Sequence, residues 1–547
     1  QYDKRAVEPA GLIKIDLLGN RALSTVHDAV ALVTRHYHTS VDIEDRAVAS
    51  DAKAARLVSR GDSLGVFQSE SPGMRRTLRE LGTRTLEDLT VTLALFKPGP
   101  LRGGLKDAFV QRHRGKEPVR YLHPSLQTIL ESTYGVILYQ EQVLRIAHEL
   151  AGFTLEEADQ LRRAIAHLGH GDEMVPLRDQ FLERIEQGSG IPPGAARRLW
   201  DMMFSFAGYG FLKAHAASYA AVSYQTAYLK ANFPAEFMTA ILRSRGGYYP
   251  QRIYLGEARR LGLILRPPHI NQSGRTFKMV SGLEGQAVLW MGLGQIRELT
   301  RRTMAEILQA RRDGPFASLD DLLQRARPRQ AEAENLVKAG ALDGLGSGRK
   351  AMLAELESRK PGAPLQLALP WARSEAEDDT ELERLALEVE MLGWPVSTHA
   401  LAPFAGRLAE QGVTSSDRIA AQAGRRITVA GARMGLWREN RGRITLEDET
   451  GLFSARLPGG RKLASGSLGR LGPYLIRGQA QIDGNGEPDP CVGAARAYDG
   501  CIDTDDLAAG VQQGAAGIAA VHRSVDLEEI VGAVTKVSDI IAEIAAA

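Results

Sequence analysis

A short apolar run near the start of the chain, residues 11–18, carries two side chains that could take part in chemistry. Lys14 and Asp16 share one face of the predicted buried strand, because side chains two residues apart point to the same side. A carboxylate within an apolar strand costs free energy unless it is paired or binds a cation. The pattern predicts either a metal-binding Asp16 beside a phosphate-binding Lys14, or the exposed polar face of an edge strand.

Cations accompany several turns and helices between residues 96 and 215. Residues 96–102 form a stiff turn, because two prolines fix φ and a glycine allows a tight path, and a Gly-rich break at 206–211 precedes two more basic residues. Each cation alone is typical of a solvated helix face. Together they predict one extended phosphate-binding surface. The residues concerned are Lys97, Arg102, Arg162, Arg163, Lys213 and His215.

A Gly-x-Gly turn, formed by Gly292 and Gly294, precedes a basic stretch. Such a turn between helices lets backbone N–H groups approach a phosphate closely. Between residues 286 and 312 five arginines stand against two glutamates, which favours sequence-independent contact with a nucleic-acid backbone. The alternative is a plain pair of packed helices without a ligand. The arginines are Arg297, Arg301, Arg302, Arg311 and Arg312.

From residue 426 the apolar period changes to two, which predicts a small antiparallel β unit over 426–485. Small Greek-key barrels such as the OB-fold often bind single strands by stacking bases on aromatic side chains. Only Trp437, Phe453 and Tyr474 could stack bases here. Core packing is the alternative role for at least two of them.

Length and composition limit the class of protein. The 547 residues predict about three to five domains, and 44% apolar with 24% charged residues argue against wholesale disorder. A net charge of +2 excludes a polybasic protein. Cys491 and Cys501 cannot build a disulfide scaffold or a four-ligand zinc site, and they favour a reducing, cytoplasmic compartment. The longest central uncharged run, 216–229, is too short and too polar to cross a membrane.

The pattern along the chain predicts a multidomain, mainly α protein with a small C-terminal antiparallel β-barrel and a helical tail. Residues 357–375 are rich in Pro, Gly, Ala and Leu and are typical of a linker. The tail carries apolar residues at coiled-coil spacing between residues 527 and 544. The chain opens on Gln1 close to a strand-like run and has no signal peptide, so we expect a missing N-terminal part.

Taken in order, the motifs resemble those of the bacterial DNA polymerase III alpha subunits, the C-family polymerases of replicative or error-prone type. The resemblance covers residues 1–485. The matching segments are GLIKIDLLGNRALS, LGVFQSES, ALFKPGPL, YGVILYQEQV, ADQLRRAI, FAGYGFLKAHAASYA, YLKANFPAEFM, GLGQIREL and ITLEDETG.

The resemblance implies an order of palm, fingers, tandem helix-hairpin-helix and OB-fold domains. On that order the predicted boundaries are a palm remnant at 1–40, fingers at 41–270, a helix-hairpin-helix region at 271–355, a linker with a helix at 356–425, an OB-like domain at 426–498 and a coiled-coil-like tail at 499–547.

The implied activity is template-directed DNA synthesis, a nucleotidyl transfer supported by two Mg²⁺ ions. Asp16 matches the third of three catalytic, metal-binding aspartates, and Lys14 matches a lysine beside the incoming triphosphate. We expect the other two aspartates upstream of Gln1, so this chain alone should bind nucleic acid without polymerising. The six cations between Lys97 and His215 fall in finger motifs that meet nucleotide and primer–template.

A further implied partner is the sliding clamp. Gln366, Leu367 and Leu369 resemble the clamp-binding peptide that the family carries between its hairpins and OB-fold. A linker that meets this pattern by chance is the alternative. The other implied partners are primer–template DNA, deoxynucleoside triphosphates and replisome subunits, without a membrane.

Two other functions stay open. The first is a non-catalytic DNA-binding or replisome-scaffold protein derived from the same family. The second, a coiled-coil signalling protein, rests only on the tail, whose wording after about residue 510 resembles a helix of methyl-accepting chemotaxis receptors. A chimeric reading frame is our explanation for that tail.

Overall fold

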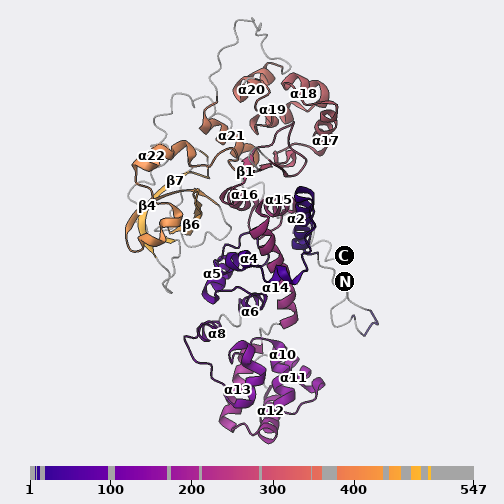
Figure 1. Ribbon diagram of the computed structural model, residues 1–547, viewed down its shortest axis with the longest axis vertical. Helices are drawn as coiled ribbons and strands as arrows, with labels where there is room; N and C mark the ends of the chain where they lie inside the picture. The colour runs from indigo at the N-terminus through magenta and orange to yellow at the C-terminus, as the bar shows by residue number, and fades with distance from the viewer. Residues whose placement is uncertain are drawn as a thin grey trace, which may run out of the picture. The chain divides into compact units, whose positions relative to one another are not determined.

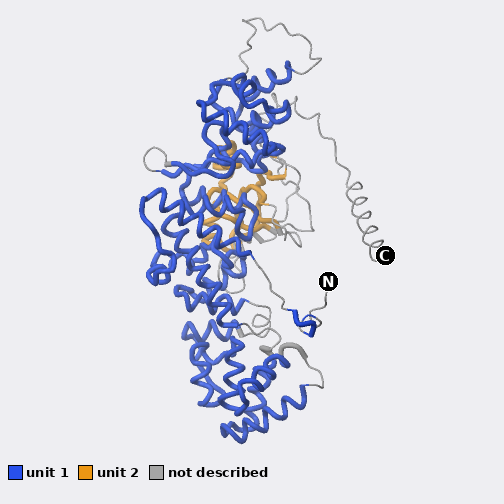
Figure 2. Tube along the Cα trace, turned by 90° about the vertical axis from the view of Figure 1, so that its right-hand side faces the viewer, with its two compact units in different colours: residues 1–397 blue, residues 398–547 orange. Residues whose placement is uncertain are grey.

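The computed structural model describes residues 7, 9–12, 19–96, 105–168, 174–207, 212–281, 286–346, 348–359, 379–434, 443–456, 468, 470–481 and 491–493. The chain divides into two compact units, residues 1–397 and 398–547 (Figure 2). Most of the predicted N-terminal strand, most of the linker and the whole predicted tail lie outside the described residues.

The N-terminal part of the first unit is built from helices (Figure 1). They are α2 (Arg21–Tyr37), α3 (Arg46–Ala49), α4 (Ala52–Ser59), α5 (Pro72–Leu81), α6 (Leu86–Leu95), α8 (Leu105–His113), α9 (Gln127–Leu130), α10 (Gln140–Arg145), α11 (Leu155–Leu168), α12 (Met174–Ser189), α13 (Pro193–Ala207), α14 (Lys213–Asn232), α15 (Pro234–Ser244) and α16 (Gln251–Arg260).

Local sequence explains where these helices begin and end. Ser71 accepts a hydrogen bond from the backbone of Met74 at the start of α5, and Pro72 fits the first turn because it needs no N–H partner there. Gly82 ends the helix in the left-handed region, at φ 70°. Thr85 then opens α6 with a reciprocal capping box to Asp88.

Helix α14 is the central element of this part and packs against α2, α4, α6 and α15. Its alanines, such as Ala220 and Ala227, are fully buried and let neighbouring helices approach closely. Lys230 near its end is also buried, and its Nζ atom donates to Glu257 Oε1 and to the Asp62 carbonyl, both at 2.6 Å. Burial lowers the pKa of Lys230, and the Glu257 carboxylate acts in the opposite direction.

A small mixed sheet follows, in the order β1 (Ile264–Arg266), β3 (Ala287–Trp290), β2 (Lys278–Ser281), with β1 parallel and β2 antiparallel to β3. Two helix pairs come next and bury a shared apolar core. They are α17 (Arg301–Ala310) with α18 (Leu319–Ala326), and α19 (Gln330–Lys338) with α20 (Arg349–Ser358). Helix α21 (Glu381–Leu392) closes the unit and adds Met391 to that core.

A buried glutamate joins the two helix pairs. Glu332 on α19 accepts hydrogen bonds from the Thr300 and Arg329 backbone N–H groups, at 2.9 and 3.0 Å, and from the Thr303 hydroxyl at 2.8 Å. Burial alone would raise the pKa of this carboxyl. The hydrogen bonds from Thr300, Arg329 and Thr303 outweigh burial and lower the pKa to about 2.

The second unit contains α22 (Ala405–Glu410) and a closed barrel in the order β4-β5-β6-β8-β7. The strands are β4 (Arg426–Arg433), β5 (Arg443–Glu447), β6 (Leu452–Arg456), β7 (Tyr474–Gln481) and β8 (Cys491–Gly493). Asp448, in the β5–β6 turn, accepts the backbone N–H groups of Ser416, Thr450 and Gly451 at 2.6 to 2.9 Å.

The predicted fold class, mainly α with a small C-terminal β unit, is confirmed. One strand pair differs from the antiparallel expectation, because β6 and β8 run parallel. The β2–β3 hairpin was not predicted from the sequence; its strands are four residues each, too short for a clear period of two. Among the described residues, no helix combines the length and the apolar composition that a membrane span needs.

We predict that Glu332→Gln destabilises the two helix pairs α17–α18 and α19–α20 at neutral pH by about 1–3 kcal/mol, because an amide cannot satisfy all of the carboxylate's buried donors. The folded pKa lies below the usual value of 4.5, so the carboxylate's contribution is present above pH 4.5 and is lost as the pH falls towards 2. Scanning calorimetry should therefore show a gap between wild type and variant at pH 7 that shrinks by pH 3.5. The exposed Glu298→Gln is the control, and a pH-independent gap would contradict this role for Glu332.

Candidate nucleic-acid interface

A cleft of about 630 Å³ opens in the first unit. Its first lining residue in the sequence, Gly19, follows the undescribed residues 13–18. The cleft is lined by the start of α2, the loop between α4 and α5 with the first turn of α5, the end of α6, helix α14, and the end of α15 with the loop that follows. Residues lining it include Asn20, Arg21, Phe67, Gln68, Glu70, His215, Tyr219, Gly247 and Tyr248.

Glu70 holds two of these loops together from inside the protein. Its carboxylate accepts the N–H of Gly65 and the N–H of Tyr248, both at 2.8 Å, and the Tyr254 hydroxyl at 2.6 Å. Burial raises the pKa of Glu70, while the hydrogen bonds from Tyr254, Gly65 and Tyr248 act in the opposite direction. The same residue thus sets the positions of the α4–α5 loop and the loop after α15.

One glycine is required for this arrangement. Gly247 has φ 92°, and a Cβ atom added to it would lie 2.0 Å from the Tyr254 hydroxyl oxygen. A larger residue would therefore displace the tyrosine that donates to Glu70.

Aromatic rings lie on the α14 side of the cleft. The centre of the exposed His215 ring lies 4.3 Å from that of the Tyr219 ring, and the centre of the Phe67 ring lies 5.3 Å from that of Tyr219. The sequence-based prediction included His215 and missed Phe67, Glu70 and Tyr219. The polar cluster 68–71 before a proline was the available signal, and it indicates a turn without showing which side chain is buried.

Three other predicted finger residues are described: Arg162 and Arg163 lie on α11 and Lys213 begins α14, and hydrogen bonds connect both helices to α10. The Arg162 guanidinium donates to Gln140 Oε1 at 2.8 Å and to Asp159 Oδ1 at 2.9 Å. The Glu141 carboxylate accepts the Lys213 backbone N–H at 3.0 and 3.1 Å, at the first residue of α14. These contacts join the YQEQ, DQLRR and LKAH motifs, which are far apart in the sequence.

Their side chains are exposed to different degrees. Arg162 is 22% exposed and tied to its neighbours, whereas Arg163 is 67% exposed, although it also pairs with Asp159 at 2.6 Å. Lys213 is exposed, and its ammonium nitrogen lies 5.8 Å from the centre of the Tyr139 ring. Lys213 and His215 are two residues apart on α14, so their side chains lie on different sides of the helix: Lys213 towards α10 and His215 towards the cleft.

The Gly-x-Gly turn has a packing role in this structure. The N–H groups of Leu293 and Gly294 donate to the carbonyls of Gly274 and Arg275, at 2.9 and 3.0 Å. A Cβ atom on Gly292 would lie 2.5 Å from the Thr276 carbonyl carbon. Glycine permits this close backbone approach, and those two N–H groups are already bonded within the chain.

The five arginines that follow differ in exposure, and Arg312 is exposed in the turn after α17. Arg297, Arg301 and Arg302 are exposed, and Arg302 pairs with Glu306 at 3.2 Å. Arg311 is structural, because its guanidinium donates to the Ile270 and Ser273 carbonyls, both at 2.7 Å. Arg297, Arg301 and Arg302 lie at or just before the start of α17.

Seven of the predicted site residues lie outside the described residues: Lys14, Asp16, Lys97, Arg102, Gln366, Leu367 and Leu369. Within the described ranges, no three His, Cys, Asp or Glu side chains are grouped as metal ligands. The fit of Mg²⁺ to this chain therefore depends on Asp16 and stays a prediction. In the barrel, Phe453 and Tyr474 are buried, which confirms core packing for these two aromatic residues.

Comparison with known proteins gives two family matches. Residues 22–189 match the bacterial DNA polymerase III alpha subunit finger domain, and residues 262–352 match a helix-hairpin-helix motif. Similar proteins include the DNA polymerase III subunit alpha of Thermus aquaticus, 39% identical over 432 residues, which are 74% of this chain and 34% of the relative. The error-prone DNA polymerase of Symbiobacterium thermophilum is 35% identical over 510 residues, 83% of this chain and 46% of the relative. The chain thus spans between a third and a half of the length of these relatives.

We predict that Glu70→Gln loosens the cleft, because one amide oxygen cannot accept all three donors and one is left unpaired at a cost of about 1–3 kcal/mol. Hydrogen–deuterium exchange should become faster in peptides covering residues 64–71 and 246–250. The exposed Glu44→Gln serves as the matched control. Unchanged protection of both peptides in Glu70→Gln would show that this carboxylate does not hold the loops.

Proposed function

Through its finger domain and helix-hairpin-helix region the chain belongs to the bacterial DNA polymerase III alpha family, and we propose that it serves template-directed DNA synthesis within such a subunit. Its part is to supply the fingers, the duplex-binding hairpins and an OB-like domain. The family's role in DNA replication follows from the relatives, and the role of this particular stretch is our proposal.

The observation that carries the proposal is the convergence at the start of α14. Lys213 faces the α10–α11 side, where Arg162 is held by Gln140, and His215 lines the cleft. A guanidinium held in place by neighbouring side chains, as Arg162 is, can bind phosphate with little loss of conformational entropy, and the fixed first residue of α14 positions Lys213 beside it. The arrangement suits a triphosphate or a primer–template backbone that passes from the cleft across the start of the helix.

We assign the chemistry itself to residues that precede the cleft residue Gly19 in the sequence. We propose Asp16 as a metal ligand and Lys14 as a triphosphate-binding residue, joined by Lys97 and Arg102 in the fingers. Bound Mg²⁺ would activate the primer 3′-hydroxyl and neutralise the triphosphate. Two-metal chemistry uses several carboxylates, so the 547-residue chain alone should bind DNA without extending a primer.

The remaining assignments follow the same family pattern. The exposed arginines before and on α17 would bind duplex phosphates without reading bases. Gln366, Leu367 and Leu369 would bind a sliding clamp, and the barrel would act as an OB-like domain. A non-catalytic DNA-binding protein would share the phosphate contacts, and primer extension by a protein that also carries the other two metal-binding aspartates separates the two functions.

We predict that duplex binding by this chain is dominated by phosphate contacts. The logarithm of the association constant should fall steeply with the logarithm of salt concentration, with little preference among duplex sequences. Replacing Arg301 and Arg302 with Gln should make the slope shallower by roughly 1–2 units, since each lost phosphate contact removes about 0.9. Fluorescence anisotropy with a labelled duplex measures both quantities.

The control replaces two exposed arginines on other helices, Arg35→Gln and Arg56→Gln, with the same change in net charge. It should leave the slope nearly unchanged. A flat salt dependence of the wild type, or equal effects of the two double variants, would refute the phosphate-contact assignment.

A further inference from the structure

Helix α21 lies outside the stretch that matches the helix-hairpin-helix motif, yet it packs on the second helix pair, α19–α20. It is strongly acidic: Glu381, Glu383, Glu388 and Glu390 lie on it, and Asp379 lies just before it. The helix therefore brings negative charge to a region whose proposed partner is the DNA backbone.

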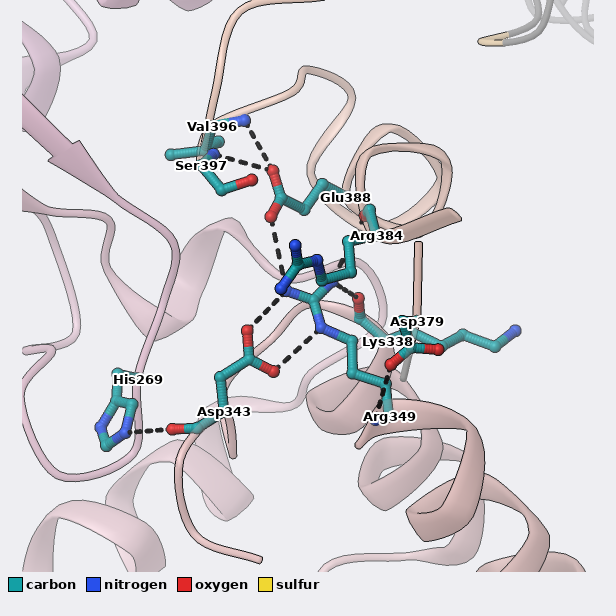
Figure 3. A network of polar contacts seen from close by, with 9 residues as sticks. All are labelled: His269, Lys338, Asp343, Arg349, Asp379, Arg384, Glu388, Val396 and Ser397. Carbon is teal, nitrogen blue, oxygen red and sulfur yellow. Dashed lines mark hydrogen bonds and ion pairs between the residues drawn. The ribbon is translucent and has the colours of Figure 1, made fainter. Parts of the chain in front are cut away.

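Three of these carboxylates contact two lysines and one backbone N–H group of the α19–α20 pair, which could otherwise bind phosphate. Glu390 pairs with Lys338 at 2.9 Å, and Glu383 pairs with Lys350 at 2.8 Å. Asp379 Oδ2 accepts the Arg349 backbone N–H at 2.8 Å, at the first residue of α20 (Figure 3). Anions bind at the N-termini of helices and beside lysines, and here the chain's own carboxylates take those places.

The docking of α21 does not depend on these partly exposed pairs. The buried Arg349 guanidinium donates to both oxygens of Asp343 at 2.9 and 2.7 Å and also contacts the buried Glu388 at 3.4 Å (Figure 3). Glu388 also accepts the N–H groups of Val396 and Ser397, at 2.7 and 2.9 Å. Exposed ion pairs contribute little to stability, whereas this buried network and Met391 in the core fix the helix.

The first helix pair contrasts with the second. Arg301 and Arg302 at the start of α17 are exposed. The ion pair described for these two arginines joins Arg302 to Glu306 on the same helix. The cations of α19–α20 are matched by carboxylates from another element. Phosphate contact should thus differ between the two pairs.

We propose that the acidic face of α21 competes with DNA phosphate for the cations of α19–α20 and so restricts backbone contact to the α17 side. The proposal rests on the DNA binding proposed above. It makes α21 an internal, phosphate-mimicking partner that weakens duplex binding by this region.

The test is the double variant Glu383→Gln, Glu390→Gln in the full chain, titrated with a labelled duplex. Glutamine keeps the capping acceptor that Glu383 offers to Thr380, so α21 should stay folded. Removing the two carboxylates takes away the ion pairs through which α21 competes with phosphate for Lys338 and Lys350. We expect binding about fivefold tighter or more near 0.1 M salt, and a salt slope steeper by about 1.8 units, since each phosphate contact contributes about 0.9.

A charge-matched control separates this effect from net charge. Glu44→Gln with Glu186→Gln changes two exposed carboxylates on other parts of the unit and should alter affinity less than twofold. In the wild type, Lys338→Gln with Lys350→Gln should also have little effect, because both lysines are engaged. In the α21 double variant the same lysine changes should abolish the gain.

Several outcomes would overturn the proposal: no gain in the α21 variant, an equal gain in the control, or a gain that persists without the two lysines. If thermal unfolding shows that the double variant is misfolded, the single variant Glu390→Gln tests the proposal instead, because Glu390 has no capping role. This single variant should give about half of the change in salt slope. If the wild type binds no duplex, the proposed function fails; the α21 inference then holds only if the variant binds.

Discussion

Buried carboxylates that accept backbone N–H groups from other loops and helices hold this structure together. Glu70 joins the α4–α5 loop to the loop after α15, Glu332 joins α17 to α19, Glu388 fixes the chain after α21, and Asp448 ties the β5–β6 turn to Ser416. A charged acceptor with several donors is strong in a low-dielectric interior, and costly if a donor is lost. Each carboxylate therefore fixes one local geometry on which neighbouring functional groups depend.

The candidate site follows from this constraint. Glu70 shapes the cleft, and Glu141 fixes the first residue of α14 through the Lys213 N–H. With the start of α14 fixed, Lys213 and His215 are presented to different sides of the same helix turn. The proposed control of duplex binding by α21 depends on the same kind of contact, because Glu388 holds the helix while its outer carboxylates bind lysines.

The sequence predicted what depends on local patterns. Gly and Pro turns and apolar periods indicated the mainly α fold, the short helices after residue 286 and the C-terminal β unit, and ordered motifs indicated the cations at α11, α14 and α17. The long-range contacts were not predictable. Glu70 and Glu80 both stand near arginines and turns, yet Glu70 accepts backbone N–H groups from two separate loops, whereas Glu80 pairs with Arg76 and Lys106. Gly292 suited a phosphate turn equally well, and only the structure shows Thr276 against it.

The most direct test of the account is hydrogen–deuterium exchange of the full chain with and without a duplex at low salt. The account predicts protection by DNA in peptides covering the start of α14, residues 213–219, and the start of α17, residues 300–306. Peptides covering α20 and α21 should be unchanged in the wild type. Protection confined to α20 and α21, or no protection at the start of α14, would contradict the account.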